Sequence, residues 1–354
     1  MSRWSVASAR VEIVRARLRR PFVTALGERL FTENAALTLR LAGGAVGYGE
    51  ASTSLAMKSL TAAALTRALR ALAALARGRD ARDWRALSER AWRRFPDLGP
   101  AVAAFESALL SALAREAGLP LAHFFGGAAR SLETDLTISA SRDPALAAEA
   151  AAEAARAGFT TLKVKVGGAA ADDLARVRAV AAAAPGARLI LDGNQGLTPR
   201  GALELLERAA RLGAKVVLLE QPVRKDDERG LLFVARRSPV PVAADESAAT
   251  PAQAARLLDS GAATAVNVKL AKSGVARGLE ICALARAAGV PLMIGCMAET
   301  APGLSSSVHL ALGTGFFRFV DLDSDVLLVQ DPAARLRAGW TRRGRFVEAA
   351  PARA

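Results

Sequence analysis

The sequence predicts an α/β protein in which an N-terminal α+β domain precedes a closed barrel of parallel strands. After residue 130, short apolar segments alternate with Ala-rich helical segments, and the eight predicted strands start 24 to 27 residues apart. A closed parallel barrel needs eight such even βα units, whereas an open doubly wound sheet does not. No Gly-rich phosphate loop follows the first of these strands. The strands are predicted to begin near Thr134, Thr161, Arg188, Lys215, Pro241, Ala265, Pro291 and Arg318.

The first fifty residues predict an antiparallel arrangement. Ser5–Arg17 and Ala35–Leu41 alternate apolar and polar residues, as strands do. Gly43-Gly44 predicts a hairpin turn after the second strand. Pro21–Asn34 predicts a polar loop between the two strands.

The rest of the N-terminal region predicts helices. From Leu60 to Ala117 apolar residues recur with a helical period, which is broken at Pro96 and Pro100. The C-terminal stretch contains the strand-like segment Arg345–Glu348 and is expected to return to the first domain. We therefore predict an N-terminal domain at residues 1–130, a barrel at residues 131–326 and a C-terminal return at residues 327–354.

The net charge of +14 does not predict a nucleic-acid site. Residues 131–330 carry 22 basic and 22 acidic side chains, so the excess of positive charge lies outside them. It consists of Arg spread along helices such as Ala63–Arg94, without interleaved aromatic residues or a basic run. Solvated helix faces explain this pattern better than a basic binding protein does.

Other features of the sequence favour a cytoplasmic protein. No run of 18 apolar residues occurs, which excludes a membrane-spanning helix. The N-terminus lacks the apolar core of a signal peptide. Cys282 and Cys296 are too few for a disulfide framework, so a reducing compartment is expected. The sequence does not settle whether the chain forms a homo-oligomer.

Two lysines stand inside the apolar segment Thr161–Val166. Lys163 and Lys165 are two positions apart, so both point to the same face of a strand. A buried ammonium is costly unless it is paired, and the chain contains only 7 Lys against 41 Arg. A solvated edge strand is the alternative, and this segment alone does not decide between the two.

The barrel strands end in charged residues, and active sites of such barrels lie at these ends. The charged residues there are Lys163, Lys165, Asp192, Glu220, Asp245, Lys269, Asp321 and Asp323. Asp192, Glu220 and Asp245 end three consecutive strands, and like charges so close together need compensation. Three oxygen ligands without His or Cys predict Mg²⁺, with Mn²⁺ as a substitute. Helix capping by each acid is the weaker alternative.

Lys163 and Lys269 are then predicted to lie on opposite sides of the metal. Their strands precede and follow the three metal strands. One lysine could remove the α-proton of a bound carboxylate substrate and the other could return it on the opposite face. The metal would stabilise the enediolate formed between the two steps. We expect Lys165 to lower the pKa of Lys163 by its positive charge.

In combination, these motifs resemble the muconate-lactonizing subgroup of the enolase superfamily. The motifs are Lys163-Val164-Lys165, Asp192-Gly193-Asn194, Glu220-Gln221-Pro222, Asp245-Glu246-Ser247 and Lys269. The resemblance covers nearly the whole chain. It implies a modified TIM barrel of the (β/α)₇β type, with a capping domain formed by the N-terminal region and the C-terminal tail.

Within that subgroup, Asp321-Leu322-Asp323 resembles the signature of dipeptide epimerases such as L-Ala-D/L-Glu epimerase. The resemblance implies that Asp321 and Asp323 bind the α-ammonium of a dipeptide, whose C-terminal residue is inverted at its α-carbon. A helix cap or a rim turn is the alternative. The resemblance also implies substrate contacts from Lys165, Asn194, Cys296, Met297 and Thr137.

The capping loop departs from the family pattern. Family members selective for a C-terminal Glu carry an Arg soon after a stretch like Pro21–Leu26, but here Gly27, Glu28 and Arg29 follow. The preferred dipeptide is therefore open. Met57 and Lys58 are further candidates for the pocket wall.

Two other reactions of the same scaffold are alternatives. An o-succinylbenzoate synthase or N-acylamino-acid racemase shares the metal site and lysines but gives no reason for Asp321 and Asp323. An acid-sugar dehydratase or mandelate-type racemase uses a His after the seventh strand. The two histidines, His123 and His309, are not at a strand end, and His309 is expected to be structural.

Overall fold

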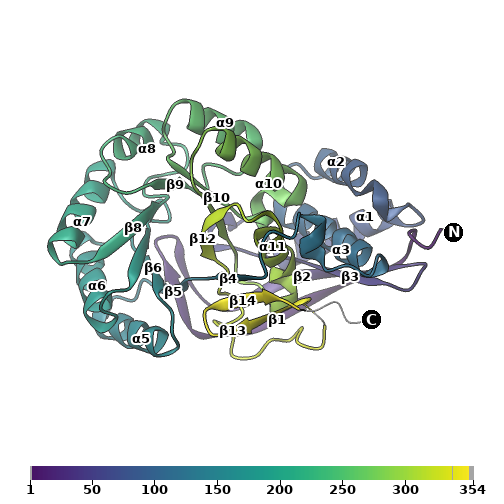
Figure 1. The fold of residues 1–354 in the computed structure, drawn as a ribbon, viewed down its shortest axis with the longest axis horizontal. Coiled ribbons are helices and arrows are strands. Elements are labelled where there is room, and N and C mark those ends of the chain that lie inside the picture. Colours follow the sequence, from purple (N-terminus) through teal and green to yellow (C-terminus); the bar gives the residue numbers. More distant parts are fainter. Residues whose placement is uncertain (1, 337, 351–354) are drawn as a thin grey trace.

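The computed structural model describes residues 2–336 and 338–350. Its strands form a three-stranded antiparallel sheet at the N-terminus, an eight-stranded parallel sheet and a small three-stranded sheet near the C-terminus. Figure 1 shows the parallel strands ringed by helices, with the N-terminal sheet and helices packed beside this ring. This is the predicted barrel with a second domain against it. The predicted domain limits stay a prediction.

The N-terminal sheet consists of β1 (Val6–Thr24), β2 (Gly27–Leu41) and β3 (Val46–Ala51), paired antiparallel in that order. The turn predicted at Gly43-Gly44 connects β2 to β3. The helices of this domain are η1 (Leu55–Met57), α1 (Ala62–Ala76), η2 (Ala81–Asp83), α2 (Trp84–Arg94), α3 (Gly99–Glu116) and α4 (Leu121–Phe124). Pro96 lies between α2 and α3 as expected, but Pro100 lies in the first turn of α3, where its missing N–H costs no hydrogen bond.

The prediction of a polar loop over Pro21–Asn34 was wrong. β1 and β2 continue through it as a long hairpin, and Thr24 pairs with Gly27 around the two-residue turn Ala25-Leu26. The segment reads as a loop because much of the ribbon near this tip faces solvent, so polar residues need not alternate with apolar ones. The hairpin brings Phe22 and Leu26 to the mouth of the barrel.

The eight barrel strands start within two residues of the predicted positions. They are β5 (Leu136–Ile138), β6 (Thr161–Lys165), β7 (Arg188–Asp192), β8 (Lys215–Glu220), β9 (Val242–Ala244), β10 (Ala265–Val268), β11 (Leu292–Gly295) and β12 (Phe317–Asp321). The helices between them are α5 (Pro144–Arg156), α6 (Ala170–Ala183), α7 (Pro199–Arg211), α8 (Glu228–Ala235), α9 (Pro251–Asp259), α10 (Leu270–Ala287) and α11 (Ala301–Thr314). In the described part of the chain, none of the helices combines the length and apolarity needed to cross a membrane.

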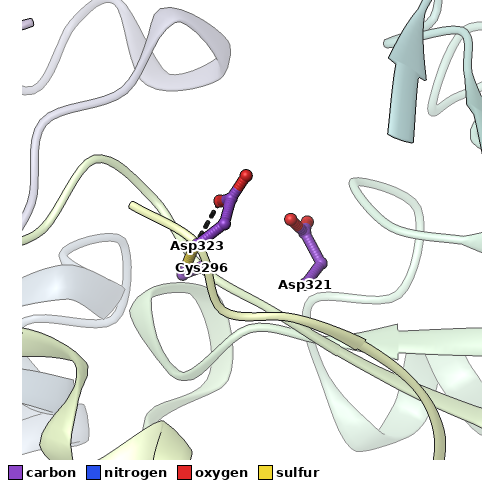
Figure 2. Close-up of side chains that lie close together, drawn as sticks. All are labelled: Cys296, Asp321 and Asp323. Atoms are coloured by element: carbon purple, nitrogen blue, oxygen red, sulfur yellow. Dashed lines mark hydrogen bonds between the residues drawn. The ribbon is translucent and has the colours of Figure 1, made fainter. Parts of the chain in front are cut away.

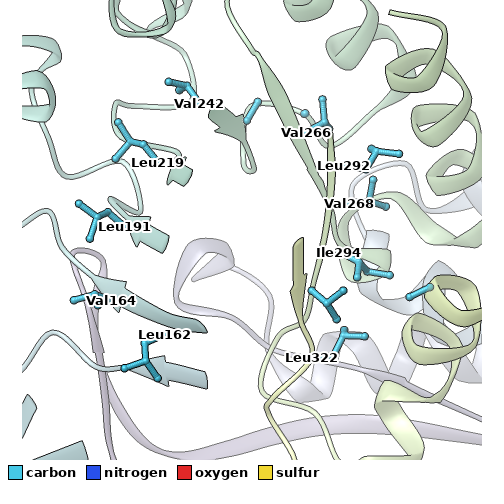
Figure 3. Close-up of a cluster of buried hydrophobic side chains, with 14 of the residues drawn as sticks. Leu162, Val164, Leu191, Leu219, Val242, Val266, Val268, Leu292, Ile294 and Leu322 are labelled. Carbon is cyan, nitrogen blue, oxygen red and sulfur yellow. The ribbon is translucent and has the colours of Figure 1, made fainter. Parts of the chain in front are cut away.

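The alternation of side chains along the barrel strands separates core from site. Leu162 and Val164 of β6 lie in the apolar layer shown in Figure 3, together with Leu191 and Leu219 of the next two strands. Lys163 and Lys165 occupy the alternate positions and therefore face the barrel interior. Below them, Ile190, Leu218, Ala243, Ala265, Met293 and Phe319 form a separate small cluster.

The two ends of the sheet meet at β5 and β12. The backbone N–H of Asp135 donates to the carbonyl of Val320 at 2.9 Å, and the N–H of Leu322 donates to the Thr134 hydroxyl at 2.9 Å. These hydrogen bonds close the barrel. They also hold the last strand, which carries Asp321, against the first.

The C-terminal tail contacts both domains. The N–H of Val329 donates to the carbonyl of Arg17 and the N–H of Arg19 donates to the carbonyl of Leu327, so the tail first runs beside β1. It then forms β13 (Trp340–Arg343) and β14 (Phe346–Ala349), and β14 pairs with β4 (Ser131–Glu133). β14 confirms the strand predicted at Arg345–Glu348.

Candidate active site

A cavity of about 380 Å³ lies between the carboxyl ends of the barrel strands and the N-terminal domain. Phe22 and Leu26 of the hairpin tip and Leu55 and Met57 of η1 form an apolar part of its wall. The barrel contributes a charged wall. Its charged residues are Lys165, Lys225, Asp245, Glu246, Lys269, Lys272, Arg277, Asp321 and Asp323.

Lys163 lies beneath this cavity. Its side chain is fully buried and is not part of the cavity wall. The ammonium lies 2.6 Å from an Asp321 oxygen, 2.7 Å from Glu220 and 3.0 Å from Asp192. Lys163 therefore joins β6, β7, β8 and β12 across the barrel interior, and the edge-strand interpretation of its segment is excluded.

Lys165 lies one layer higher and lines the cavity. Its ammonium lies 2.6 Å from an Asp192 oxygen and 5.6 Å from the centre of the Phe22 ring, which comes from the other domain. A cation over an aromatic face is attracted by the ring quadrupole. Of the two lysines on β6, only Lys165 is in contact with the space where a substrate would bind.

The three predicted metal ligands lie on adjacent strands as expected. Asp192 and Glu220 are register partners at the ends of β7 and β8, and Asp245 directly follows β9. Ammonium groups separate them: Lys163 lies between Asp192 and Glu220, and Lys269 lies 2.7 Å from Asp245 and 3.7 Å from Glu220. The acids are therefore charge-compensated by lysines in this structure.

The donor atoms around these acids fit a hard dication. Asn194 Oδ1 and one Glu246 oxygen are buried without a hydrogen-bond partner. A Glu220 oxygen also lacks a hydrogen bond, although it lies 2.7 Å from the Lys163 ammonium. Buried oxygens without donors are costly, and a cation that prefers oxygen ligands satisfies them. The assignment of Asp192, Glu220 and Asp245 as metal ligands stays a prediction.

Lys269 lines the cavity on the far side of the acids from Lys165. It precedes α10 directly, and its neighbour Lys272 in the first turn also reaches Asp245, at 2.5 Å. The amide of Asn267, on β10, donates to Glu220 at 2.7 Å. The strand order β6-β7-β8-β9-β10 thus places Lys165 and Lys269 on strands at either end of the row of acids, whereas the Lys163 ammonium lies between two of the acids.

The close charges shift the pKa values of these groups. Burial opposes ionisation of Lys163, but the carboxylates of Asp192, Asp321 and Glu220 outweigh it and raise its pKa well above the usual value. The expectation that Lys165 lowers the pKa of Lys163 was therefore wrong for this charge arrangement. Burial likewise opposes ionisation of Asp192, yet Lys163 and Lys165 hold its pKa below the usual range.

Asp321, Asp323 and Cys296 form a second cluster beside the cavity (Figure 2). Their ligand atoms all lie within 4.8 Å of one another, and the Cys296 thiol donates to Asp323 at 3.9 Å. The backbone N–H of Thr137 donates to the other Asp323 oxygen at 2.7 Å. Burial and the Asp321 carboxylate raise the pKa of Asp323 to about 6. This cluster concentrates negative charge at one end of the cavity.

The remaining predicted residues divide between wall and surroundings. Thr137, Asn194, Cys296 and Met297 line the cavity, as does Met57, whereas Lys58 is not part of the wall. Arg29 lines it as well: its guanidinium donates to the Thr53 carbonyl at 3.0 Å, and its Nε is buried without a partner. His309 is buried in α11, away from the strand ends, and its structural role stays a prediction.

Several residues in and around the site were assigned no role from the sequence. Lys272 could have been found because it follows Lys269 by one helical turn. Gln221 has a positive φ of 31°, and its amide oxygen accepts from the N–H groups of Asp245 and Ser247, which fixes the loop after β9. Asp135 is buried under Lys163 with both carboxylate oxygens unpaired, and no sequence signal singles it out.

Comparisons with known proteins agree with this arrangement. The family model for the mandelate racemase / muconate lactonizing enzyme N-terminal domain matches residues 7–126. The model described as enolase C-terminal domain-like matches residues 145–341, which is more than half of the chain. The chain therefore belongs to the mandelate racemase / muconate lactonizing enzyme family of the enolase superfamily.

Several similar proteins are named dipeptide epimerases. An aromatic dipeptide epimerase from Herpetosiphon aurantiacus is 38% identical over 93% of this chain and 92% of its own length. An L-Ala-D/L-Glu epimerase from Thermotoga maritima is 35% identical over 98% of this chain and 97% of its own length. A solved dipeptide epimerase from Enterococcus faecalis, complexed with Mg and L-Leu-L-Tyr, is 28% identical with a TM-score of 0.91, covering 98% of this chain and 97% of that one.

Proposed function

We propose that this protein is a dipeptide epimerase that inverts the α-carbon of the C-terminal residue of a dipeptide. The observation that carries the proposal is the cavity itself. Lys165 and Lys269 line it from strands on either side of those that carry Asp192, Glu220 and Asp245, and a separate acidic cluster, Asp321 and Asp323, lies at one end. The relatives named dipeptide epimerases, aligned along nearly the whole chain, support the same activity.

Asp321 and Asp323 are proposed to bind the free α-ammonium of the dipeptide. Both are buried, and together they favour a cation. The Thr137 N–H orients Asp323 from β5. The sulfur of Cys296 belongs to the same cluster, which raises the alternative of a second metal. Two hard carboxylates with one soft, protonated thiol suit an amine better, since burial raises the pKa of Cys296 well above its usual value.

Lys165 and Lys269 are proposed to transfer the protons. Both line the cavity and stand on opposite sides of the acids, so each can reach one face of a planar α-carbon. This changes the role predicted for Lys163, which lies below the cavity wall with its ammonium among three carboxylates. Lys163 instead holds Asp192, Glu220 and Asp321 in position.

Asp192, Glu220 and Asp245 are proposed to hold Mg²⁺, for which Mn²⁺ could substitute, with Asn194 and Glu246 close by. The metal would supply positive charge that stabilises the enediolate oxygens and offsets the acids, which raise the pKa of Lys269. The dipeptide carboxylate is then oriented between Lys165 and Lys269. The apolar groups of Phe22, Leu26 and Met57 exclude water from the reacting carbon.

A cytoplasmic location is part of this proposal. Both cysteines, Cys282 and Cys296, are free thiols in the structure. Free, partly or fully buried thiols suit a reducing compartment.

The test is a library of L,L-dipeptides incubated with the protein and Mg²⁺ in D₂O, followed by mass spectrometry and chiral analysis. We expect deuterium at the α-carbon of the second residue together with formation of the L,D-dipeptide. Absence of exchange with every member of the library would exclude the proposed function. Turnover of N-acylated amino acids or of the o-succinylbenzoate precursor without dipeptide exchange would favour the alternative reactions of this scaffold.

A further inference from the structure

Glu106 is a buried acid of the N-terminal domain that the chemistry described above does not use. It lies in α3 with no exposed surface. One carboxylate oxygen accepts from the hydroxyl of Ser88 in α2, and the other accepts from the backbone N–H of Val275 in α10. The Glu106 carboxylate thus accepts hydrogen bonds from residues of both domains. Burying a carboxylate is unfavourable in itself, so this contact needs an explanation.

The contact falls at an interruption of α10. Gly274 has φ 67° and ψ −179°, which breaks the helix into a first turn, residues 270–273, and a longer second segment. The break leaves N–H groups at the start of the second segment without helical acceptors. Glu106 accepts from them, and a carboxylate is favoured at such an N-terminus by the helix dipole.

The start of α10 carries two of the lysines that line the cavity. Lys269 is its N-cap residue and Lys272 lies within it, and both ammonium groups contact Asp245. The same turn packs closely against α3, since a Cβ on Gly99 would come within 2.5 Å of the Lys272 carbonyl. On the other side of the break, the Arg277 guanidinium lies 3.8 Å from the centre of the Trp92 ring.

We propose that Glu106 is a positioning residue for Lys269. It fixes the point at which the first turn of α10 ends, and so sets the place of the Lys269 ammonium relative to the reacting carbon. Lys165, on β6, is held by the barrel sheet and does not depend on this contact. The inference rests on the proposed function, in which Lys165 and Lys269 serve opposite faces of the substrate.

Because Lys269 depends on Glu106 and Lys165 does not, loss of Glu106 should affect the two dipeptide epimers unequally. A general structural role of Glu106 would affect both equally. Glu106→Leu removes both acceptors, and Glu106→Gln keeps one. For each variant, the initial rate of α-proton loss in D₂O is measured separately for the L,L- and L,D-dipeptide, and Lys269→Ala identifies the epimer that depends on Lys269. We expect Glu106→Leu to slow proton loss from that epimer by at least about tenfold, because small misplacements of a reacting group are costly.

Proton loss from the other epimer is expected to continue at near the wild-type rate while its inversion falls. Its exchange without inversion should therefore rise, and Glu106→Gln should restore part of the balance. The matched control is Glu50→Leu. Glu50 is another buried acid of the N-terminal domain, and it accepts from the N–H of Thr300 at the start of α11, so its loss should leave the exchange ratio unchanged.

A second readout needs no turnover. Without substrate, amide hydrogen exchange of residues 270–276 should be faster in Glu106→Leu than in the wild type, with α6 unchanged as an internal reference. If Glu106→Leu does not fold, Ser88→Ala replaces it and should shift the exchange ratio in the same direction.

Equal slowing of proton loss from both epimers, an equal asymmetry in Glu50→Leu, or unchanged amide exchange would overturn the inference. Failure of the wild-type protein to exchange any dipeptide would instead exclude the proposed function.

Discussion

At the scale of single residues, position along a strand decides what a side chain can do. Lys163 and Lys165 share one strand, one face and one chemistry, so the sequence could identify both but could not rank them. The structure separates them, because only the residue nearer the strand end reaches the cavity wall. The proximity of the acids at the ends of β7 and β8 could be predicted, because the carboxyl ends of parallel strands meet at one edge of the barrel.

The two lysines should respond differently to removal. Lys165→Met is expected to abolish α-proton exchange of one of the two dipeptide epimers with little change in stability. Lys163→Met leaves three buried carboxylates without their shared cation, so it should lower the free energy of unfolding by about 3–5 kcal/mol. Urea unfolding and D₂O exchange measure the two effects. A stable Lys163→Met protein that has lost exchange at a single face would return the proton-transfer role to Lys163.

Asp323 is expected to act on the dipeptide amine. Asp323→Asn removes a charge-assisted interaction worth about 1.5–3 kcal/mol, so the KM for a dipeptide should rise about 10- to 100-fold. Mg²⁺ affinity, measured by calorimetry without substrate, should stay as in the wild type. An equal loss of Mg²⁺ affinity would mean that Asp323 belongs to the metal site.

Glu299 makes stability depend on pH. Burial, and then the nearby Glu50 carboxyl, raise its pKa from 4.5 to about 8. Between these values the folded protein keeps a proton that the unfolded chain releases, so this stabilisation is complete below about pH 4.5 and is lost as the pH rises through about 8. The Glu299→Gln variant carries a neutral amide at this position at every pH. Its unfolding free energy should therefore rise relative to the wild type between pH 5 and 8.

The control for this pH effect is Glu89→Gln. Glu89 is exposed on α2, so its replacement should run parallel to the wild type at every pH. A difference between Glu299→Gln and the wild type that stays constant with pH would show that Glu299 ionises normally.

At the scale of elements, hydrophobic periodicity predicted the strands that have buried faces and missed the hairpin tip, which is largely exposed. The barrel strands were placed within two residues because each buries both faces, against the helices and against the interior. Much of the β1–β2 hairpin tip is exposed to solvent, so its sequence resembles that of a loop. Its side chains depend on the site that the tip covers, as the contact between Phe22 and Lys165 illustrates.

Packing of β3 against α3 allows no side chain at Gly49. A Cβ there would lie 1.8 Å from the Ala104 carbonyl, which is helix backbone and cannot move aside. Gly49→Ala is therefore expected to lower the free energy of unfolding by about 3 kcal/mol or more, measured by urea unfolding.

Gly43→Ala is the matched control in the same domain. The atoms that an added Cβ meets at Gly43 belong to the Glu116 side chain, which can rotate. Its effect should stay below about 1 kcal/mol. Similar losses for both variants would argue against close β3–α3 packing.

At the scale of the molecule, the proposed metal site shows what could not be predicted from the sequence. The order of the strands predicted which acids become neighbours, but the distances between them depend on which cations lie in between. Lys163 and Lys269 occupy the space between the acids, an arrangement that strand order alone does not reveal. The excess positive charge of the chain, by contrast, lies outside residues 131–330, which contain the proposed catalytic and metal-binding residues.

Because Mg²⁺ would bind the folded barrel and not the unfolded chain, it should stabilise the whole protein. At a concentration of 100 times its Kd the gain is about 2.7 kcal/mol, which corresponds to a rise in Tm of a few degrees for a chain of this size. The measurement is a thermal melt with EDTA and with rising Mg²⁺, read without substrate. Asp245→Asn should lose the Mg²⁺-dependent rise, while Asp172→Asn, an exposed acid on α6, should keep it. A rise that survives in Asp245→Asn but disappears in Asp323→Asn would place the ion at the Asp321–Asp323 cluster, and the amine-binding role proposed for those acids would then be wrong.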